Sequence, residues 1–185
     1  FDIPVDHLTA SMVLVNYFEG IRSDLGDLAI VSPDVGNVKV ANAYASALDA
    51  ELAIIDKRRE SGETVASKNL IGKVKGKTVL MVDDLISTAG TICEAAKLVM
   101  DEGADRVIAA ATHPVLCGMA MDRLMNSPIE QIVVTDSIPD RGRLEPLRDR
   151  LVELSVGPLL GEAIYRIHHD MSISALFQRG TGVKR

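Results

Sequence analysis

Apolar residues occur along the chain in short runs that alternate with segments of helical spacing. Runs of three to five apolar residues are too short for a buried helix and are typical of central strands in a parallel sheet. The predicted strands are 28–31, 53–55, 70–74, 78–82, 107–111, 132–135 and 152–155, with a tail strand at 172–177. The predicted helices are 7–21, 38–48, 91–101, 118–125 and 158–168. This alternation predicts an α/β fold, with a mostly parallel, twisted sheet flanked by helices.

Three segments between these elements lack a regular apolar pattern. Residues 60–68 are polar and small, which predicts a mobile loop. Residues 140–149 are mostly charged and predict a surface connection, and the final GTGVKR at 180–185 is expected to be disordered.

The stretch that organises the chain is KTVLMVDDLISTAGT, residues 77–91. Its apolar strand ends at Asp83 and Asp84. A hydroxyl-rich turn follows (Ser87, Thr88, Ala89, Gly90, Thr91), and a helical pattern then begins. Such a turn at a helix start directs several backbone N–H groups at one point, and the helix dipole adds partial positive charge. The turn is therefore a candidate phosphate cradle.

The two acids add a second requirement to this stretch. Carboxylates repel a bare phosphate, whereas they accept hydrogen bonds from sugar hydroxyls or bind a divalent metal. Together with the cradle they predict a pocket for a sugar phosphate. The alternative is an ordinary N-capped helix that follows two solvated acids.

Further charged residues follow other predicted strands, where parallel sheets bind their ligands. Asp34 opens a strand-to-helix turn and could hold Mg²⁺, or it could simply cap the next helix through an Asx turn. Lys57, Arg58 and Arg59 form a cationic triplet that could neutralise a transferring phosphoryl group, or a solvated basic stretch.

Composition narrows the class of protein. A chain of 185 residues, 47% hydrophobic, can bury the core of one domain. Its formal net charge of −6 disfavours a general nucleic-acid binder, and no apolar run reaches the roughly 20 residues that span a bilayer. The two cysteines, Cys93 and Cys117, lack metal-ligand spacing and indicate a reducing, cytoplasmic setting.

The motif VDDLISTAGT at 82–91 resembles the ribose-5-phosphate-binding loop of the phosphoribosyltransferase fold. Other stretches narrow this resemblance to the ribose-phosphate pyrophosphokinase family, and together they cover nearly the whole chain. They are FDIPVDHLTAS at 1–11, VSPDVG at 31–36, AIIDKRR at 53–59, ATHPVLCG at 111–118, VVTDSIP at 133–139 and LLGEAIYRIHHDMSISALF at 159–177.

The resemblance implies a Mg²⁺-dependent transfer of pyrophosphate from ATP to ribose 5-phosphate, which yields phosphoribosyl pyrophosphate (PRPP) and AMP. It assigns the ribose hydroxyls to Asp83 and Asp84, and the 5-phosphate to residues 87–91. It makes Asp34 the magnesium ligand, Lys57 the catalytic lysine and Arg59 a contact to both substrates' phosphates. It also implies a homo-oligomer, commonly a hexamer.

The chain departs from the family pattern at several positions. Asn37 stands where the family usually has a second glycine, and Ser87 where many members have Asp. Val40 and Asn42 replace arginines, and Glu60 replaces a frequent proline. These departures, and the expected absence of an ATP-binding N-terminal half, leave the alternatives of a non-catalytic regulatory relative or isolated domain of that enzyme, or a phosphoribosyltransferase. The isolated chain is expected to be inactive without the N-terminal half.

The resemblance also divides the chain into three parts. Residues 1–10 are expected to complete a missing N-terminal domain, and residues 11–170 to form the phosphoribosyltransferase-like domain. Residues 171–185 are expected to be a C-terminal tail.

Overall fold

The computed structural model describes residues 2–58 and 67–177. Within these residues one seven-stranded sheet has the order β3-β2-β1-β4-β5-β6-β7, and all neighbours are parallel except β2 and β3. The strands are β1 Leu28–Ser32, β2 Glu51–Arg58, β3 Ser67–Ile71, β4 Thr78–Leu85, β5 Arg106–His113, β6 Ile129–Thr135 and β7 Leu151–Leu154. The predicted α/β class with a mostly parallel sheet is therefore confirmed.

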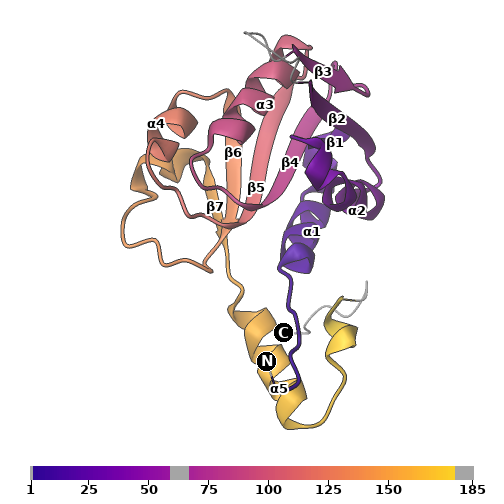
Figure 1. Ribbon diagram of the computed structural model, residues 1–185, viewed down its shortest axis with the longest axis vertical. Helices are drawn as coiled ribbons and strands as arrows, with labels where there is room; N and C mark the ends of the chain where they lie inside the picture. The colour runs from indigo at the N-terminus through magenta and orange to yellow at the C-terminus, as the bar shows by residue number, and fades with distance from the viewer. Residues whose placement is uncertain (1, 59–66, 178–185) are drawn as a thin grey trace.

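Helices lie on both faces of this sheet (Figure 1). The α-helices are α1 Ser11–Gly20, α2 Val38–Leu48, α3 Gly90–Asp101, α4 Ala120–Met125 and α5 Gly157–His168. Short 3₁₀ helices are η1 Arg22–Leu25, η2 Val35–Asn37, η3 Glu145–Arg150 and η4 Ile173–Phe177. Alternate side chains of β4 enter different cores: Val79 and Met81 pack with α3, whereas Leu80 and Val82 pack with α1 and α2. This two-sided burial explains why the strand is buried at five successive positions and apolar at four of them, Val79–Val82.

Several element boundaries differ from the sequence predictions. The strand predicted at 70–74 is β3, which ends earlier because Gly72, with φ +116°, turns the chain out of the sheet. The predicted tail strand at 172–177 is wrong: η4 occupies it, because Ile173 and Leu176 are one helical turn apart and bury the same side against Ala163. The first helix begins at Ser11 rather than His7.

The predicted surface connection at 140–149 is partly wrong as well. Leu144 and Leu147 are buried in the core on the α3 side, while their charged neighbours face solvent. Leu147 of η3 and its N-cap Leu144 are thus the two buried apolar residues in a mostly charged stretch. The loop predicted at 60–68 and the tail at 180–185 fall largely outside the described residues, although Ser67 and Lys68 belong to β3.

Helix α5 projects away from the sheet (Figure 1). It packs against η4 through a small cluster that contains Ala163 and Ile173. Leu160, Ile164 and Ile167 on this helix remain exposed, and Ile164 is 68% accessible. No described helix is both long enough and apolar enough to cross a membrane.

A candidate sugar-phosphate site at the end of β4

The two acids of the organising stretch lie at the carboxyl end of β4. Asp83 is half-buried and is in register with Ala111 of β5, while Asp84 is exposed. The backbone N–H of Asp84 donates to Oδ1 of Asp83 over 2.9 Å. This backbone bond engages only Oδ1 of the Asp83 carboxylate.

Residues 86–91, which we call the phosphate loop, connect β4 to α3. Ala89 has φ +58°, a left-handed conformation that non-glycine residues rarely adopt. The first backbone hydrogen bond of α3 runs from Cys93 N–H to Ala89 O. The N–H groups of Thr88, Ala89 and Gly90 consequently precede the helical hydrogen bonds, as an anion site at a helix start requires.

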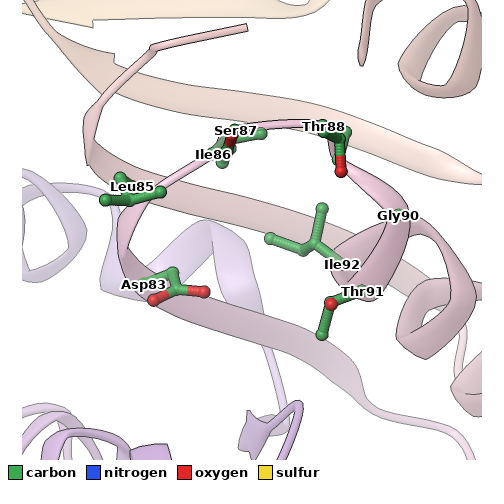
Figure 2. A pocket seen from close by; sticks show the side chains of 9 residues that line it. Asp83, Leu85, Ile86, Ser87, Thr88, Gly90, Thr91 and Ile92 are labelled. Carbon is green, nitrogen blue, oxygen red and sulfur yellow. The ribbon is translucent and has the colours of Figure 1, made fainter. Parts of the chain in front are cut away.

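The phosphate loop encloses a small open cavity (Figure 2). The loop arches from Leu85 over Ile92 to Gly90, with the Asp83 carboxylate at one foot of the arch. The cavity has a volume of about 180 Å³ and is lined by Asp83, Leu85, Ile86, Ser87, Thr88, Ala89, Gly90, Thr91 and Ile92. All seven residues predicted to hold the sugar phosphate lie at this sheet edge, and six of them line the cavity. The seventh, Asp84, faces the adjoining cavity.

The adjoining cavity has a volume of about 320 Å³ and shares Asp83 with the first. It is lined by Thr9, Ser11, Asp34, Gly36, Asn37, Val40, Tyr44, Val82, Asp83, Asp84 and Thr112. Asp34 also caps η2, since its Oδ1 accepts from Asn37 N–H over 3.0 Å. The capping and the ligand interpretations of Asp34 are therefore compatible.

Asn37 lines the second cavity and contacts the strand that carries the two acids. Its side-chain Nδ2 donates to Val82 O over 2.8 Å, directly before the two acids in β4. The departure from glycine thus ties the Asp34 turn to the strand that carries Asp83. Val40, another departure, lines the same cavity and is 44% exposed.

Burial and neighbouring acids raise the pKa of Asp83 from 3.8 to about 6. Burial is the main cause, followed by a side-chain hydrogen bond between the Asp83 and Asp84 carboxyl groups and by the negative charges of Asp84 and Asp34, whereas the bond from the Asp84 backbone N–H lowers the pKa. Ionisation of Asp83 thus costs more free energy than ionisation of an aspartate in water. A hydroxyl donor or a cation would relieve that unfavourable energy.

The donor set fits Mg²⁺, which usually takes one or two carboxylates and completes its octahedron with water and substrate phosphates. Asp34, Asp83 and Asp84 border one cavity, next to the phosphate loop. Among residues 2–58 and 67–177, no three His, Cys, Asp or Glu side chains are grouped so that they could hold a metal alone. A metal here would therefore depend on substrate oxygens.

Of the predicted catalytic cations, Lys57 and Arg59, the structure describes only the backbone of Lys57. The backbone of Lys57 lies near the end of β2 and pairs with Lys68 of β3. Since Ile54 of β2 is in register with Ser32 at the end of β1, Lys57 lies at the same carboxyl edge as Asp34. The side chain of Lys57 and the whole of Arg59 lie outside the described residues.

Sequence reasoning missed residues that contact the phosphate loop from a distance. Arg123 of α4 donates from Nη1 to Thr88 O over 2.8 Å, and Cys117 Sγ lies 3.2 Å from Ser87 Oγ. Both are separated from their partners by 30 or more positions, so no local pattern indicates them. Thr9 and Ser11 likewise join the second cavity from the start of the chain.

A mostly parallel sheet, with paired carboxylates at the end of β4 and a hydroxyl-rich loop before α3, defines the phosphoribosyltransferase type of fold. The model of the phosphoribosyl synthetase-associated domain matches residues 60–178. The chain is 51% identical to a ribose-phosphate pyrophosphokinase of Rhodopirellula baltica, over 96% of this chain and 56% of that protein. The Bacillus subtilis ribose-phosphate pyrophosphokinase is 48% identical, over 96% of this chain and 55% of that protein. The chain belongs to the ribose-phosphate pyrophosphokinase family.

A solved structure supports the same assignment. Phosphoribosylpyrophosphate synthetase from Mycobacterium smegmatis matches with a TM-score of 0.82 and 38% identity, over 92% of this chain and 54% of that chain. The chain thus spans about half the length of the relatives it matches.

Proposed function

We propose that this chain carries the ribose 5-phosphate site of a ribose-phosphate diphosphokinase, which transfers pyrophosphate from ATP to the sugar and yields PRPP and AMP. The observation that supports this most directly is the position of Asp83, which borders both the phosphate-loop cavity and the Asp34 cavity. A ligand with a phosphate at one end could place that phosphate in the phosphate-loop cavity and its hydroxyls at Asp83, next to the Asp34 cavity.

In this proposal the 5-phosphate lies in the phosphate loop. It accepts hydrogen bonds from the loop N–H groups and from the hydroxyls of Ser87, Thr88 and Thr91. The ribose 2- and 3-hydroxyls donate to Asp83 and Asp84. These contacts leave the anomeric hydroxyl directed toward the Asp34 cavity.

The reaction is an in-line displacement at the β-phosphorus of ATP. The anomeric oxygen forms a bond to that phosphorus, the bond to the oxygen that bridges the α- and β-phosphorus breaks, and AMP leaves while the hydroxyl proton is released. Lys57 and Arg59 would stabilise the charge on the transferring group, so positioning and electrostatics dominate the catalysis. Mg²⁺, held by Asp34 with Asp83 or Asp84, would neutralise the phosphate oxygens when bound.

The assay is AMP formation from ATP and ribose 5-phosphate by the full 185-residue chain, combined with calorimetric titration of ribose 5-phosphate. AMP formation that requires both substrates supports the kinase. Lys57→Ala should abolish turnover and leave ribose 5-phosphate affinity within about twofold, since Lys57 serves the transferring group. Lys97→Ala, on the exposed side of α3, is the matched control.

Two alternatives give other results. A phosphoribosyltransferase would form no AMP and would bind PRPP more tightly than ribose 5-phosphate. A non-catalytic regulatory relative would bind ribose 5-phosphate without forming AMP. It would still form none after addition of the part of a homologous enzyme that this chain does not cover. Persistent turnover in Lys57→Ala would show that another cation acts in catalysis.

The proposal extends to the organisation of the protein. Residues 1–10 would pack on a further domain, and residues 171–185 would form a tail beyond the domain at 11–170. Exposed apolar side chains at Ile3 and Ile164 support such contacts. We also propose a cytoplasmic homo-oligomer, with a hexamer as the expected state, which sedimentation equilibrium at micromolar concentration would test; a monomer would contradict it.

A further inference from the structure

Three successive carbonyl groups of the phosphate loop are held from outside the loop. Ile86 O accepts from Leu116 N–H over 2.9 Å, and Ser87 O accepts from Cys117 N–H over 3.0 Å. Thr88 O accepts from Arg123 Nη1 over 2.8 Å. Two of the three donors are backbone groups, and the third is a guanidinium from α4.

Peptide geometry links these outer bonds to the cavity. Every described peptide bond is trans, so a carbonyl and the N–H that follows it point in opposite directions. Carbonyls held from outside therefore aim the N–H groups of Ser87, Thr88 and Ala89 to the inner side of the loop. Among the described residues these three N–H groups find no acceptor. The cavity lies on that inner side, and Arg123 does not line it.

The bond from Arg123 differs from the other two in its charge and its setting. A hydrogen bond from a charged donor is stronger than one between neutral groups, and it polarises the peptide it contacts, which makes the Ala89 N–H a better donor. The guanidinium also packs against Gly90, since a Cβ at position 90 would lie 3.3 Å from Nη1. Ala89 is in the left-handed conformation, which costs free energy. The peptide between Thr88 and Ala89 therefore depends on a hydrogen bond from outside the loop to keep its orientation.

We propose that Arg123 is a positioning residue for the phosphate loop: it holds the Thr88 carbonyl so that the Ala89 N–H stays aimed at a bound phosphate. The ligand in question is a phosphate group, and its identification as that of ribose 5-phosphate rests on the proposed function. Arg123 acts through the loop peptide and does not contact the ligand.

The test measures the dissociation constants of inorganic phosphate and ribose 5-phosphate in the full chain, by calorimetry without metal. Arg123→Ala should weaken both about tenfold, the effect typical of losing one charge-assisted hydrogen bond. Arg123→Lys retains the charge and a single donor, and should recover part of the affinity. Arg148→Gln on η3, where the arginine pairs with Glu145 at the surface, is the control and should change affinity less than twofold.

A second measurement separates positioning from stability. Hydrogen exchange at the Cys117 amide of the unliganded protein, which donates to Ser87 O, should accelerate in Arg123→Ala and not in Arg148→Gln, because the loop that accepts this bond can then move. Millimolar methylguanidine should restore phosphate affinity to Arg123→Ala by occupying the vacated position. If Arg123→Ala does not fold, Arg123→Lys carries the comparison.

The outcomes are distinct. Phosphate affinity in Arg123→Ala within twofold of wild type overturns the inference, even if stability falls. Failure of the wild type to bind inorganic phosphate overturns it as well. Wild type that binds phosphate but not ribose 5-phosphate overturns the proposed function alone, and the phosphate titrations still decide the role of Arg123.

Discussion

Replacing Asp83 with Asn should stabilise the ligand-free protein and abolish tight binding of ribose 5-phosphate. The side-chain oxygen of Asn can still accept the Asp84 N–H bond, so the local backbone keeps its partner. The change removes a negative charge that is half-buried beside Asp84 and near Asp34. The substitution thus raises the stability of the protein and removes the charge that ligand binding needs.

The pKa of Asp83 sets the magnitude and the pH window. A rise from 3.8 to about 6 means that the folded protein holds a proton that the unfolded chain releases. Wild-type stability therefore falls as pH increases from about 4 to about 6. A shift of about two units corresponds to roughly 3 kcal/mol, and solvent screening at this partly exposed site reduces that to about 1 kcal/mol. The gain in Asp83→Asn should be complete above about pH 7 and vanish near pH 4.

Urea unfolding of wild type and Asp83→Asn at pH 4.5 and pH 8 measures this effect, with EDTA present to exclude metal. Asp149→Asn, at an exposed position of η3, is the control and should change stability by less than about 0.5 kcal/mol at either pH. Ribose 5-phosphate titrations on the same samples should show at least tenfold weaker binding in Asp83→Asn. A loss of stability at pH 8, or an equal gain at both pH values, would refute the electrostatic argument.

Three further substitutions test the packing around the site. Gly72→Ala should destabilise the fold by about 3 kcal/mol in urea unfolding, because its Cβ would lie 2.7 Å from the Cβ of Ala53 at φ +116°. Thr135→Val should cost about 1–2 kcal/mol in the same assay, because the fully buried Thr135 hydroxyl donates to Thr112 O over 2.7 Å; an unchanged midpoint would contradict that role. Ala89→Val should weaken phosphate binding in a calorimetric titration, because a β-branched residue resists φ +58°, whereas Ala89→Gly should retain it.

The sheet could be predicted because each central strand is buried on both faces and so reads as an uninterrupted apolar run. Apolar runs did not indicate elements that are buried on one side only or whose buried residues are spaced as in a helix. The strand β3 pairs only with β2 in an antiparallel edge, and its polar sequence at Ser67–Asn69 carries no apolar signal. The buried residues are Leu147 and the N-cap Leu144 at η3, and Ile173 and Leu176 at η4; two residues one turn apart are too few for a periodicity to be recognised.

The inner lining of the candidate site was predictable for a different reason. Asp83 and the phosphate loop are contiguous in sequence, so a strand end, a hydroxyl-rich turn and a helix start bring them to one cavity without any long-range contact. The roles assigned to those residues stay predictions, and so do those of Lys57 and Arg59.

The outer support of the loop could not be predicted, because it depends on how β5 and α4 return to β4. Arg123 reaches Thr88 across 35 positions, and Leu116 reaches Ile86 across 30. Each peptide has an N–H donor and a C=O acceptor, and both need a partner when the peptide is buried. The N–H groups on the inner side are therefore held toward an anion when the carbonyls on the outer side are hydrogen-bonded. A loop with this motif but without a donor behind Thr88 would therefore keep its sequence signature and lose part of its affinity. The loop motif thus supplies the groups that would contact the ligand, whereas the surrounding fold determines how strongly they bind it.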